Sequence, residues 1–356
     1  MSPQQHVLFP DAREAAPAEL LFSDVSLREG EQCEGVSFPV ETKLDLAREL
    51  EAAGVGQIQV GFPGRYGDDL RAARRIQAAL TRAQVEVVAL AFVPDWEQEI
   101  DDCLRSEADV VNVVVRASPR LQRVIDFSPD DALRRVSEAV GRATAAGSTV
   151  AFTPSDATRA DLDFLVEIWR AAVEAGASRI YVADSIGVAT PELVTLLVQR
   201  ALALGVTVGI HCHNDFGLAV ANTIAGVLAG AEIVDAAVNG LGDRAGNVPL
   251  EEVVAALALI YELDLSVDLS RLTALSQSFA AASGRILPPN KPVSGPHVFA
   301  HVLPTHTSAI RRDSRSIQPF EPDLVGNIQR LAERPSSPPS VASPGPAVSL
   351  QVRHDV

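Results

Sequence analysis

An alternation of short apolar runs with amphipathic segments constrains the fold of this chain more than any other feature. Eight runs have the length and composition of buried strands, and they lie at residues 21–27, 55–62, 85–92, 109–118, 148–155, 178–185, 206–215 and 231–242. Each run is followed by a segment rich in Ala, Leu, Glu and Arg with helical spacing. Eight strand-then-helix units of this total length are typical of a (β/α)8 barrel.

The connecting segments carry helix start and stop signals. Residues 41–54 place Leu44, Ala47 and Leu50 on one helical stripe and end at a glycine. Thr190 and Pro191 form an N-cap followed by a proline at the first helical position. A doubly wound open sheet is the alternative fold, but no GxGxxG motif follows the first run. We therefore predict an α/β protein of the (β/α)8 TIM barrel class.

The pattern changes after about residue 265, and this change predicts the domain organisation. We expect an N-terminal extension at 1–19, a catalytic barrel at 20–267 and a short α-rich C-terminal subdomain at 268–332. Residues 333–356 are rich in Pro and Ser, so we expect a disordered tail that buries too little apolar surface to offset chain entropy.

Charge and cysteine content exclude several function classes. The 30 Lys and Arg residues against 46 Asp and Glu give a net charge of −16, which argues against nucleic acid or an anionic membrane as the main partner. The three cysteines are far apart and form no CxxC pair, so we expect no disulfide framework and a reducing, cytoplasmic location. No apolar run is long enough to span a bilayer, and the N-terminus lacks the layout of a secretory signal.

Polar residues collect where the predicted strands end, which is where a barrel carries its catalytic groups. The candidates that follow the strands are Asp24, Arg28, Glu29, Gln32, Arg116, Ser118, Thr153, Ser185, His211, His213 and Asn247. Polar residues at the start of loops are the ordinary alternative for any one of these clusters.

The sequence His211-Cys212-His213 is the sharpest local signal. Residues i and i+2 of a strand face the same way, so both imidazoles can reach one ion while Cys212 points away. Asp24, on the neighbouring first strand of a closed barrel, is our candidate for the anionic ligand, and Asn247 for a further carbonyl ligand. Two imidazoles and a carboxylate suit Zn, Mn, Mg or Fe(II). A hydrogen-bonded histidine pair is the alternative.

Arg28 is followed by the carboxylates Glu29 and Glu31. One interpretation is a solvated run of charge. The other is a buried guanidinium beside the metal, held by Glu partners and directed at an oxyanion. On this second interpretation Arg28 and Glu29 are candidate catalytic residues.

Three long motifs are similar to those of one enzyme family: DVSLREGEQ (24–32), GIHCHNDFGLAVANTIAGVLAGA (209–231) and NGLGDRAGNVPLEEVV (239–254). Together they resemble the Claisen-condensing, metal-dependent barrel enzymes of the homocitrate synthase, 2-isopropylmalate synthase and citramalate synthase family, of the DRE-TIM metallolyase type. Shorter motifs in 152–165, 182–193 and 290–301 look like the same family in the same order. The similarity covers about residues 20–330.

This resemblance implies an acyltransferase that condenses acetyl-CoA with a 2-oxo acid and hydrolyses the thioester, giving homocitrate or a substituted malate. It assigns Asp24, His211 and His213, with Asn247, to a divalent ion (Mn, Mg or Zn) that chelates the oxo acid. Arg28 matches the arginine that stabilises enolate and alkoxide charge. His301 matches a histidine that assists proton transfer in the partner subunit's active site, so residues 268–332 are expected to be the arm of a homodimer.

The resemblance also frames the substrate pocket, whose expected lining is Gln32, Gln59, Arg116, Ser118, Thr153 and Ser185. Gln59 replaces a frequent Glu, Asn112 a frequent His, and Asp243 the longer Glu of the GERAGN motif. These departures lie at substrate- and proton-handling positions and indicate a non-standard 2-oxo acid.

Two other functions stay open. One is a carbon–carbon lyase of the hydroxymethylglutaryl-CoA lyase type, although the chain has GDRAGN where those enzymes carry a catalytic cysteine loop. The other is a non-catalytic barrel that binds an acyl-CoA or an oxo acid. Because the sequence ends at residue 356, we expect no C-terminal regulatory domain of the leucine-inhibited kind.

Overall fold

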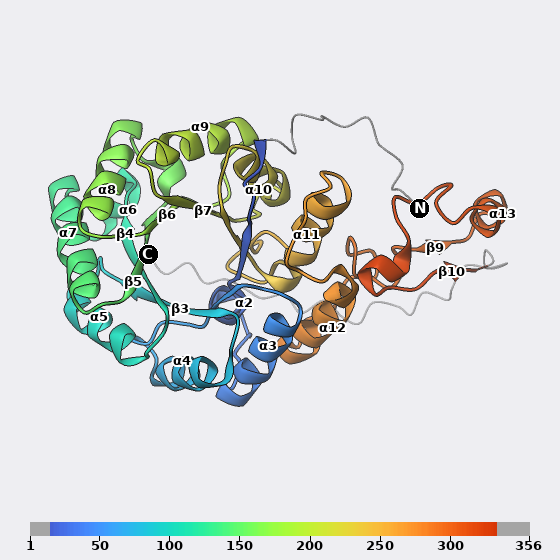
Figure 1. The fold of residues 1–356 in the computed structure, drawn as a ribbon, viewed down its shortest axis with the longest axis horizontal. Coiled ribbons are helices and arrows are strands. Elements are labelled where there is room, and N and C mark those ends of the chain that lie inside the picture. Colours follow the sequence, from blue (N-terminus) through green and yellow to red (C-terminus); the bar gives the residue numbers. More distant parts are fainter. Residues whose placement is uncertain (1–14, 333–356) are drawn as a thin grey trace, which may run out of the picture.

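The computed structural model describes residues 15–332 and has a closed barrel of eight parallel strands in sequential order, with β1 beside β8 (Figure 1). This confirms the predicted α/β barrel. The strands are β1 Leu21–Asp24, β2 Gln57–Gln59, β3 Gln84–Leu90, β4 Val110–Arg116, β5 Thr149–Ser155, β6 Arg179–Asp184, β7 Thr207–Cys212 and β8 Ile233–Ala236. The predicted tail and the first fourteen residues lie outside the described part of the chain.

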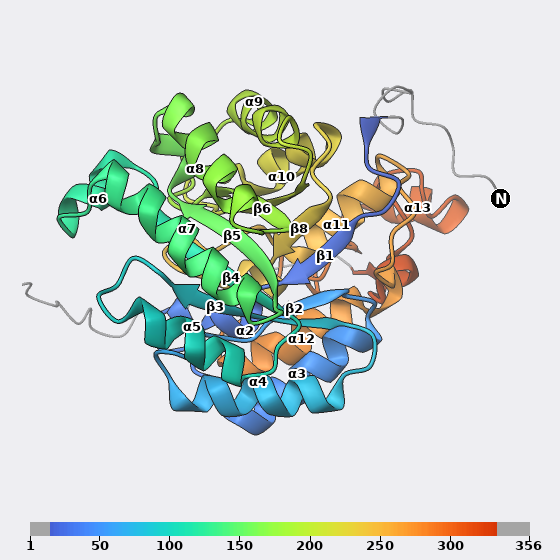
Figure 2. The same cartoon turned by 60° about the vertical axis from the view of Figure 1, so that its left-hand side comes forward.

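Helices surround the barrel and separate it from solvent (Figure 2). They are α2 Ser26–Glu29, α3 Val40–Ala52, α4 Gly67–Ala79, α5 Trp96–Arg105, α6 Pro119–Val124, α7 Pro129–Ala145, α8 Leu162–Glu174, α9 Pro191–Leu202, α10 Ala219–Leu228 and α11 Leu250–Leu259. The start signal at Thr190 is confirmed, because its side chain accepts a hydrogen bond from the Leu193 backbone N–H at 3.4 Å. No helix in the range 15–332 is long and apolar enough to cross a membrane.

The apolar core lies mainly between the strands and the helices, where Val, Ala, Leu and Ile side chains pack in one large cluster. The cluster of buried apolar residues inside the barrel is much smaller and consists of Val110, Ala151, Tyr181 and Ile233. Barrel interiors are usually filled by branched apolar side chains. Here polar side chains occupy most of the inward positions between that cluster and the carboxyl ends of the strands, where the candidate site lies.

After the barrel the chain forms α12 Leu272–Ser283, α13 Pro304–Arg312 and a parallel pair of two-residue strands, β9 Ala300–His301 and β10 Arg330–Leu331. Helix α12 packs on the barrel, since Phe279 is fully buried and meets Phe38 edge-on with ring centroids 6.4 Å apart. Strand β9 and α13 lie to the side of the barrel in Figure 1. The boundary at residue 267/268 stays a prediction.

A buried ion pair fixes the loop after β1 to the next two helices. Lys43 of α3 is 2% exposed, and its Nζ lies 2.6 Å from both Asp69 Oδ1 and Glu31 Oε2 and donates to the Val60 carbonyl at 3.0 Å. Three anionic or carbonyl partners satisfy this ammonium group, as a buried charge requires.

We expect Lys43→Met to lower the free energy of unfolding by about 3–5 kcal/mol, because Asp69 is then left buried without its cation. Chemical denaturation followed by circular dichroism measures the change. The double variant Lys43→Met/Asp69→Leu is the control, and it should be less destabilised than Lys43→Met alone. Equal loss in both variants would show that packing around Lys43, and not charge pairing, holds these helices.

Candidate metal centre

The turn after β1 decides which carboxylate enters the barrel mouth. Asp24 ends β1, and its two carboxylate oxygens accept hydrogen bonds from the Ser26 backbone N–H and hydroxyl, each at 2.9 Å. Such a local side-chain cap favours an immediate turn. The chain therefore passes directly into the single turn of α2, and Glu29 at its end is 4% exposed.

Asp24 is fully buried outside the cluster of potential ligands. Burial raises the pKa of its carboxyl to about 7, although the bonds from Ser26 oppose that rise. The Ser26 hydroxyl in turn accepts from the Val238 N–H at 2.7 Å, which ties the end of β1 to the segment after β8. Asp24 thus shapes the turn, while Glu29 lies among the histidines, and the assignment of Asp24 as a metal ligand stays a prediction.

Glu29, His211 and His213 form the one group of potential ligands of this kind within residues 15–332, with ligand atoms within 4.8 Å of one another. The two Nε2 atoms of His211 and His213 are 3.3 Å apart, and His211 Nε2 lies 3.8 Å from Glu29 Oε1. Asn247 Nδ2 lies 3.2 Å from His211 Nε2. The expected pair of imidazoles and Asn247 therefore meet at the carboxyl end of the barrel.

A second carboxylate sets the tautomer of His211. Asp235 of β8 lies 3.0 Å from His211 Nδ1 through its Oδ2, and the two residues are in register on neighbouring strands. An ionised carboxylate only accepts, so Nδ1 carries the proton and Nε2 keeps its lone pair. A carboxylate behind a ligating imidazole is the usual outer partner of metal-bound histidine.

The electrostatics of this cluster fit a cation. Burial, with His211 as the second cause, lowers the pKa of His213 to about 4, so its ring is neutral at ordinary pH. Burial raises the pKa of Glu29, but Arg28 and the two histidines outweigh it and lower that pKa below its usual value. Glu29 Oε2 and Asn247 Oδ1 are buried and have no partner among the described residues. A divalent ion would use these lone pairs, which are costly to leave unmade.

Arg28 lies beside this cluster and is held on several sides. Its Nε donates to Gln59 Oε1 and its Nη1 to Glu29 Oε1, while its guanidinium lies 5.5 Å from the centre of the Phe62 ring. Of the two interpretations of the LREGE run, the buried guanidinium held by a glutamate describes the structure. Such a fixed donor stabilises negative charge that develops next to it.

Two expected pocket residues lie inside the barrel below Arg28. Gln59 is fully buried, and its Nε2 donates to Glu86 while its carbonyl oxygen accepts from Arg28. Thr153 is half-buried, and its hydroxyl donates to Asn112 Oδ1 at 2.9 Å. Both residues face the barrel interior, and their part in a substrate pocket stays a prediction.

The remaining expected pocket residues lie at the rim. Arg116 stacks on Phe92 at 4.5 Å and donates to the Leu121 carbonyl at 3.2 Å. Ser118 is fully buried, caps α6 and donates to Asp156. The Ser185 hydroxyl accepts from the Asp156 N–H at 2.8 Å, and Gln32 is exposed. Ser118 and Ser185 thus hold loops together through Asp156.

His301 is not part of the cluster in its own chain. It lies in β9 of the C-terminal segment, and its Nε2 is 3.3 Å from Gln318 Oε1. Its ring faces that of His306 with centroids 6.4 Å apart. Figure 1 shows β9 to the side of the barrel, so a single chain does not bring His301 to Glu29 and the two histidines.

Two acids that the sequence reasoning missed are built into the barrel interior. Asp235 is 3% exposed and Glu86 is fully buried. Each interrupts an apolar strand run, in AEIVDAAV and VEVVALAF. An acid at an inward position of such a run is the signal that identifies them, because buried acids are rare without partners.

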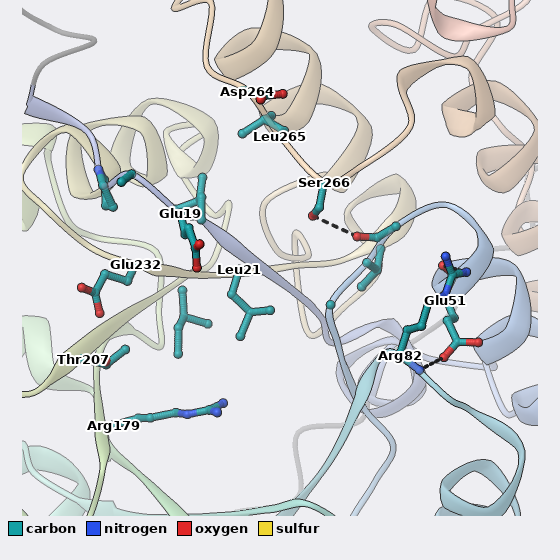
Figure 3. Close-up of a pocket in the computed structure, with 17 residues that line it drawn as sticks. Glu19, Leu21, Glu51, Arg82, Arg179, Thr207, Glu232, Asp264, Leu265 and Ser266 are labelled. Atoms are coloured by element: carbon teal, nitrogen blue, oxygen red, sulfur yellow. Dashed lines mark hydrogen bonds between the residues drawn. The ribbon is translucent and has the colours of Figure 1, made fainter.

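A cavity of about 1210 Å3 opens at the opposite end of the barrel, where the strands begin (Figure 3). Its lining includes Leu21, Arg179 and Thr207, the first residues of β1, β6 and β7. Figure 3 also shows the Ser266 hydroxyl, which bonds the Gly54 carbonyl at 3.0 Å. None of Glu29, His211, His213 and Asn247 lines this cavity, so it is separate from the candidate metal centre.

Comparison with known proteins finds a matching family model and similar sequences. The family model described as HMGL-like matches residues 19–278. The chain is 39% identical over 317 residues to a probable 2-isopropylmalate synthase of Methanopyrus kandleri, covering 88% of this chain and 63% of that protein. It is 36% identical to the homocitrate synthase AksA of the same organism, covering 90% of this chain and 82% of that protein.

Among solved structures, hydroxymethylglutaryl-CoA lyase from Pseudomonas aeruginosa superposes with a TM-score of 0.66 at 24% identity, covering 76% of this chain and 95% of that one. At this identity the likeness concerns the fold alone. This chain therefore shares its barrel with lyases, while its nearer sequence relatives carry the names of synthases.

Measurements of metal affinity distinguish the roles of Asp24 and Glu29. We expect Glu29→Gln to weaken Mn²⁺ or Zn²⁺ binding more than about 100-fold, since loss of even an outer partner costs 10–100-fold. Asp24→Asn should leave the affinity within about threefold, because Asp24 only caps the turn. Isothermal titration calorimetry of the two folded variants measures both metal affinities. Strong loss in Asp24→Asn with little loss in Glu29→Gln would restore the assignment made from sequence.

Proposed function

This chain belongs to the HMGL-like family, and on that premise we propose that it condenses acetyl-CoA with a 2-oxo acid and hydrolyses the resulting thioester. The observation that carries the proposal is the convergence of Glu29, His211 and His213 beside the fixed guanidinium of Arg28. Because this chain spans 63% of the length of the Methanopyrus 2-isopropylmalate synthase, that relative's activity is part of the proposal and not a finding.

Glu29, His211, His213 and Asn247 would hold a divalent ion, and two imidazoles with oxygen ligands suit Zn, Mn or Mg. When bound, such an ion polarises the keto group of the oxo acid and orients it. Asp235 keeps His211 in the tautomer that presents Nε2 to the ion. Asp24 is outside this set in our proposal.

The other steps of the proposed reaction depend on side chains of this protein. A methyl proton of acetyl-CoA must leave before the methyl carbon can attack the keto carbon, which turns the keto oxygen into an alkoxide. Arg28 lies where it stabilises that negative charge, since its Nε and Nη1 are already held by Gln59 and Glu29. Hydrolysis of the thioester then releases the CoA thiol and a second carboxylate.

The proton-transfer role falls to His301 of a second copy of the chain. Two observations support a homodimer whose C-terminal segments reach the partner's barrel. His301 lies outside the cluster of its own chain. The same segment exposes large apolar side chains, with Ile286 at 91%, Leu303 at 54% and Ile328 at 58%, which a partner subunit would cover.

A reducing, cytoplasmic location completes the proposal. Its support is that Cys33, Cys103 and Cys212 are all unpaired thiols.

Free thiol release tests the activity. Purified protein with Mn²⁺, Mg²⁺ or Zn²⁺, acetyl-CoA and a panel of 2-oxo acids should release CoA with at least one acid. Arg28→Lys should lower kcat by about 10²–10³-fold, the usual cost of losing one oxyanion donor. Arg48→Lys, which changes an exposed arginine paired with Asp45, is the matched control and should retain full activity.

Failure to release thiol with every acid and metal would refute the condensation. Cleavage of hydroxymethylglutaryl-CoA by the same preparation would favour the lyase alternative instead. Binding of an oxo acid without turnover in either direction would favour the non-catalytic barrel.

Subunit mixing tests the role of His301. Glu29→Gln and His301→Ala should each be inactive alone. After unfolding and refolding of an equal mixture, about one quarter of the sites should combine an intact Glu29 with an intact His301 from the other chain, as two-fold symmetry requires. Light scattering should show a dimer. Absence of any recovery in a verified mixed dimer would place His301 outside the partner's site.

A further inference from the structure

Glu86 is a buried acid that the proposed chemistry does not use. It lies in β3 with no exposed surface, and three side-chain amides surround its carboxylate. Gln57 Nε2 donates to Oε2 at 2.9 Å, Asn112 Nδ2 donates to Oε1 at 3.2 Å, and Gln59 Nε2 also donates to Oε1. Two of these amides belong to Gln59 and Asn112, which contact Arg28 and Thr153 of the expected substrate site.

A carboxylate that accepts from an amide fixes which end of that amide points away from it. An ionised carboxylate has no proton to give, so each neighbouring amide must turn its NH2 group toward Glu86. The carbonyl oxygen of each amide then points to the opposite side. The ionised carboxylate of Glu86 therefore determines which end of the Gln59 and Asn112 amides is the nitrogen and which is the oxygen.

The orientation of the Asn112 amide determines the direction in which the Thr153 hydroxyl donates. Because Asn112 Oδ1 points away from Glu86 and only accepts, the Thr153 hydroxyl gives its single proton to it at 2.9 Å. Toward the cavity Thr153 therefore offers lone pairs and no donor. Thr153 is half-buried and is the outermost member of this chain of hydrogen bonds, so it is the one that a bound oxo acid would contact.

The orientation of the Gln59 amide likewise determines its contact with Arg28. The carbonyl oxygen of Gln59 accepts from Arg28 Nε, and Glu29 accepts from Nη1. Arg28 keeps three of its five N–H donors, and Gln59 and Glu29 fix the direction in which the guanidinium presents them. Arg116 lies four residues beyond Asn112 on β4, and its guanidinium is held on Phe92 and the Leu121 carbonyl at the rim.

The charged groups beneath these amides are two acids and one arginine, so the acids outnumber the cation. Asp235, 3% exposed, is the second acid inside the barrel, and Arg179 reaches this layer from the far end, donating to Gln57 at 2.5 Å and to Gln84 at 2.9 Å. A second carboxylate on the substrate would thus face acceptors with two buried acids behind them, and such a like-charge juxtaposition is strongly unfavourable.

We propose that Glu86 sets the direction of the hydrogen bonds at the floor of the cavity and thereby selects a 2-oxo acid whose side chain carries no second carboxylate. This inference rests on the proposed function and specifies its substrate class. Glu86 is a positioning residue, since it acts through Asn112 and Gln59 and is itself sealed from the cavity.

Binding of two matched compounds to the Mn²⁺-loaded protein tests the inference without turnover. The first is 2-oxoglutarate, and the second is 5-methyl-2-oxohexanoate, in which an isopropyl group replaces the distal carboxylate. At pH 8 Glu86 is ionised, since burial, with Asp235 as the second cause, raises its pKa to about 7. Calorimetry should show the isopropyl compound binding at least about tenfold more tightly.

Glu86→Gln should reduce that preference at least about fivefold, because a neutral amide removes the charge and lets Asn112 and Thr153 reverse. Thr153→Val should shift the preference in the same direction and covers the case in which Glu86→Gln does not fold. Glu99→Gln is the matched control: Glu99 is a 1% exposed acid of α5 outside the barrel, and this variant should leave the preference unchanged.

The outcomes separate the inference from the proposed function. Binding of neither compound in the presence of Mn²⁺ would contradict the proposed oxo-acid site as a whole. Binding with equal affinity or with preference for 2-oxoglutarate, or an unchanged preference in folded Glu86→Gln and Thr153→Val, would overturn the role of Glu86 while leaving the oxo-acid site standing.

Discussion

Two imidazoles whose Nε2 atoms lie 3.3 Å apart are the constraint around which the mouth of this barrel is organised. His211 gives its other ring proton to Asp235, so the lone pair of its Nε2 faces His213. The neighbouring oxygens of Glu29 and Asn247 add further unmatched lone pairs in a buried place. Such a concentration of acceptors is unfavourable by itself and becomes favourable with a cation among them.

The same constraint explains why the barrel interior is polar. Glu29, Asp235 and Glu86 bring three carboxylates into a space that Arg28 and Arg179 only partly balance. The cost of burying these groups is met by hydrogen bonds between side chains and by the aliphatic layer outside the strands. The overall charge of −16 does not enter this balance, because the groups that decide it are sealed from solvent.

The barrel could be predicted from the sequence because the spacing and the length of the apolar runs determine this fold. The eight apolar runs correspond to the eight strands, and the Thr190–Pro191 start signal lies where α9 begins. The histidine pair was also accessible, since alternation along a strand places residues two apart on one face.

The position of Glu29 beside the two histidines was not accessible in the same way. It depends on the Ser26 cap that turns the chain into α2 immediately after β1, and spacing along the sequence does not reveal that turn. The role of Asp235 depends on the register of β7 and β8, which places it opposite His211.

Anomalous diffraction from crystals soaked with Zn²⁺ tests the central claim most directly, because it locates the ion without relying on activity. The account predicts one strong peak bonded to His211 Nε2 and His213 Nε2 at about 2.0–2.1 Å and to a Glu29 carboxylate oxygen at about 2.0–2.2 Å. A peak bonded to Asp24 instead of Glu29, or a fully occupied ion elsewhere with this cluster empty, would contradict it.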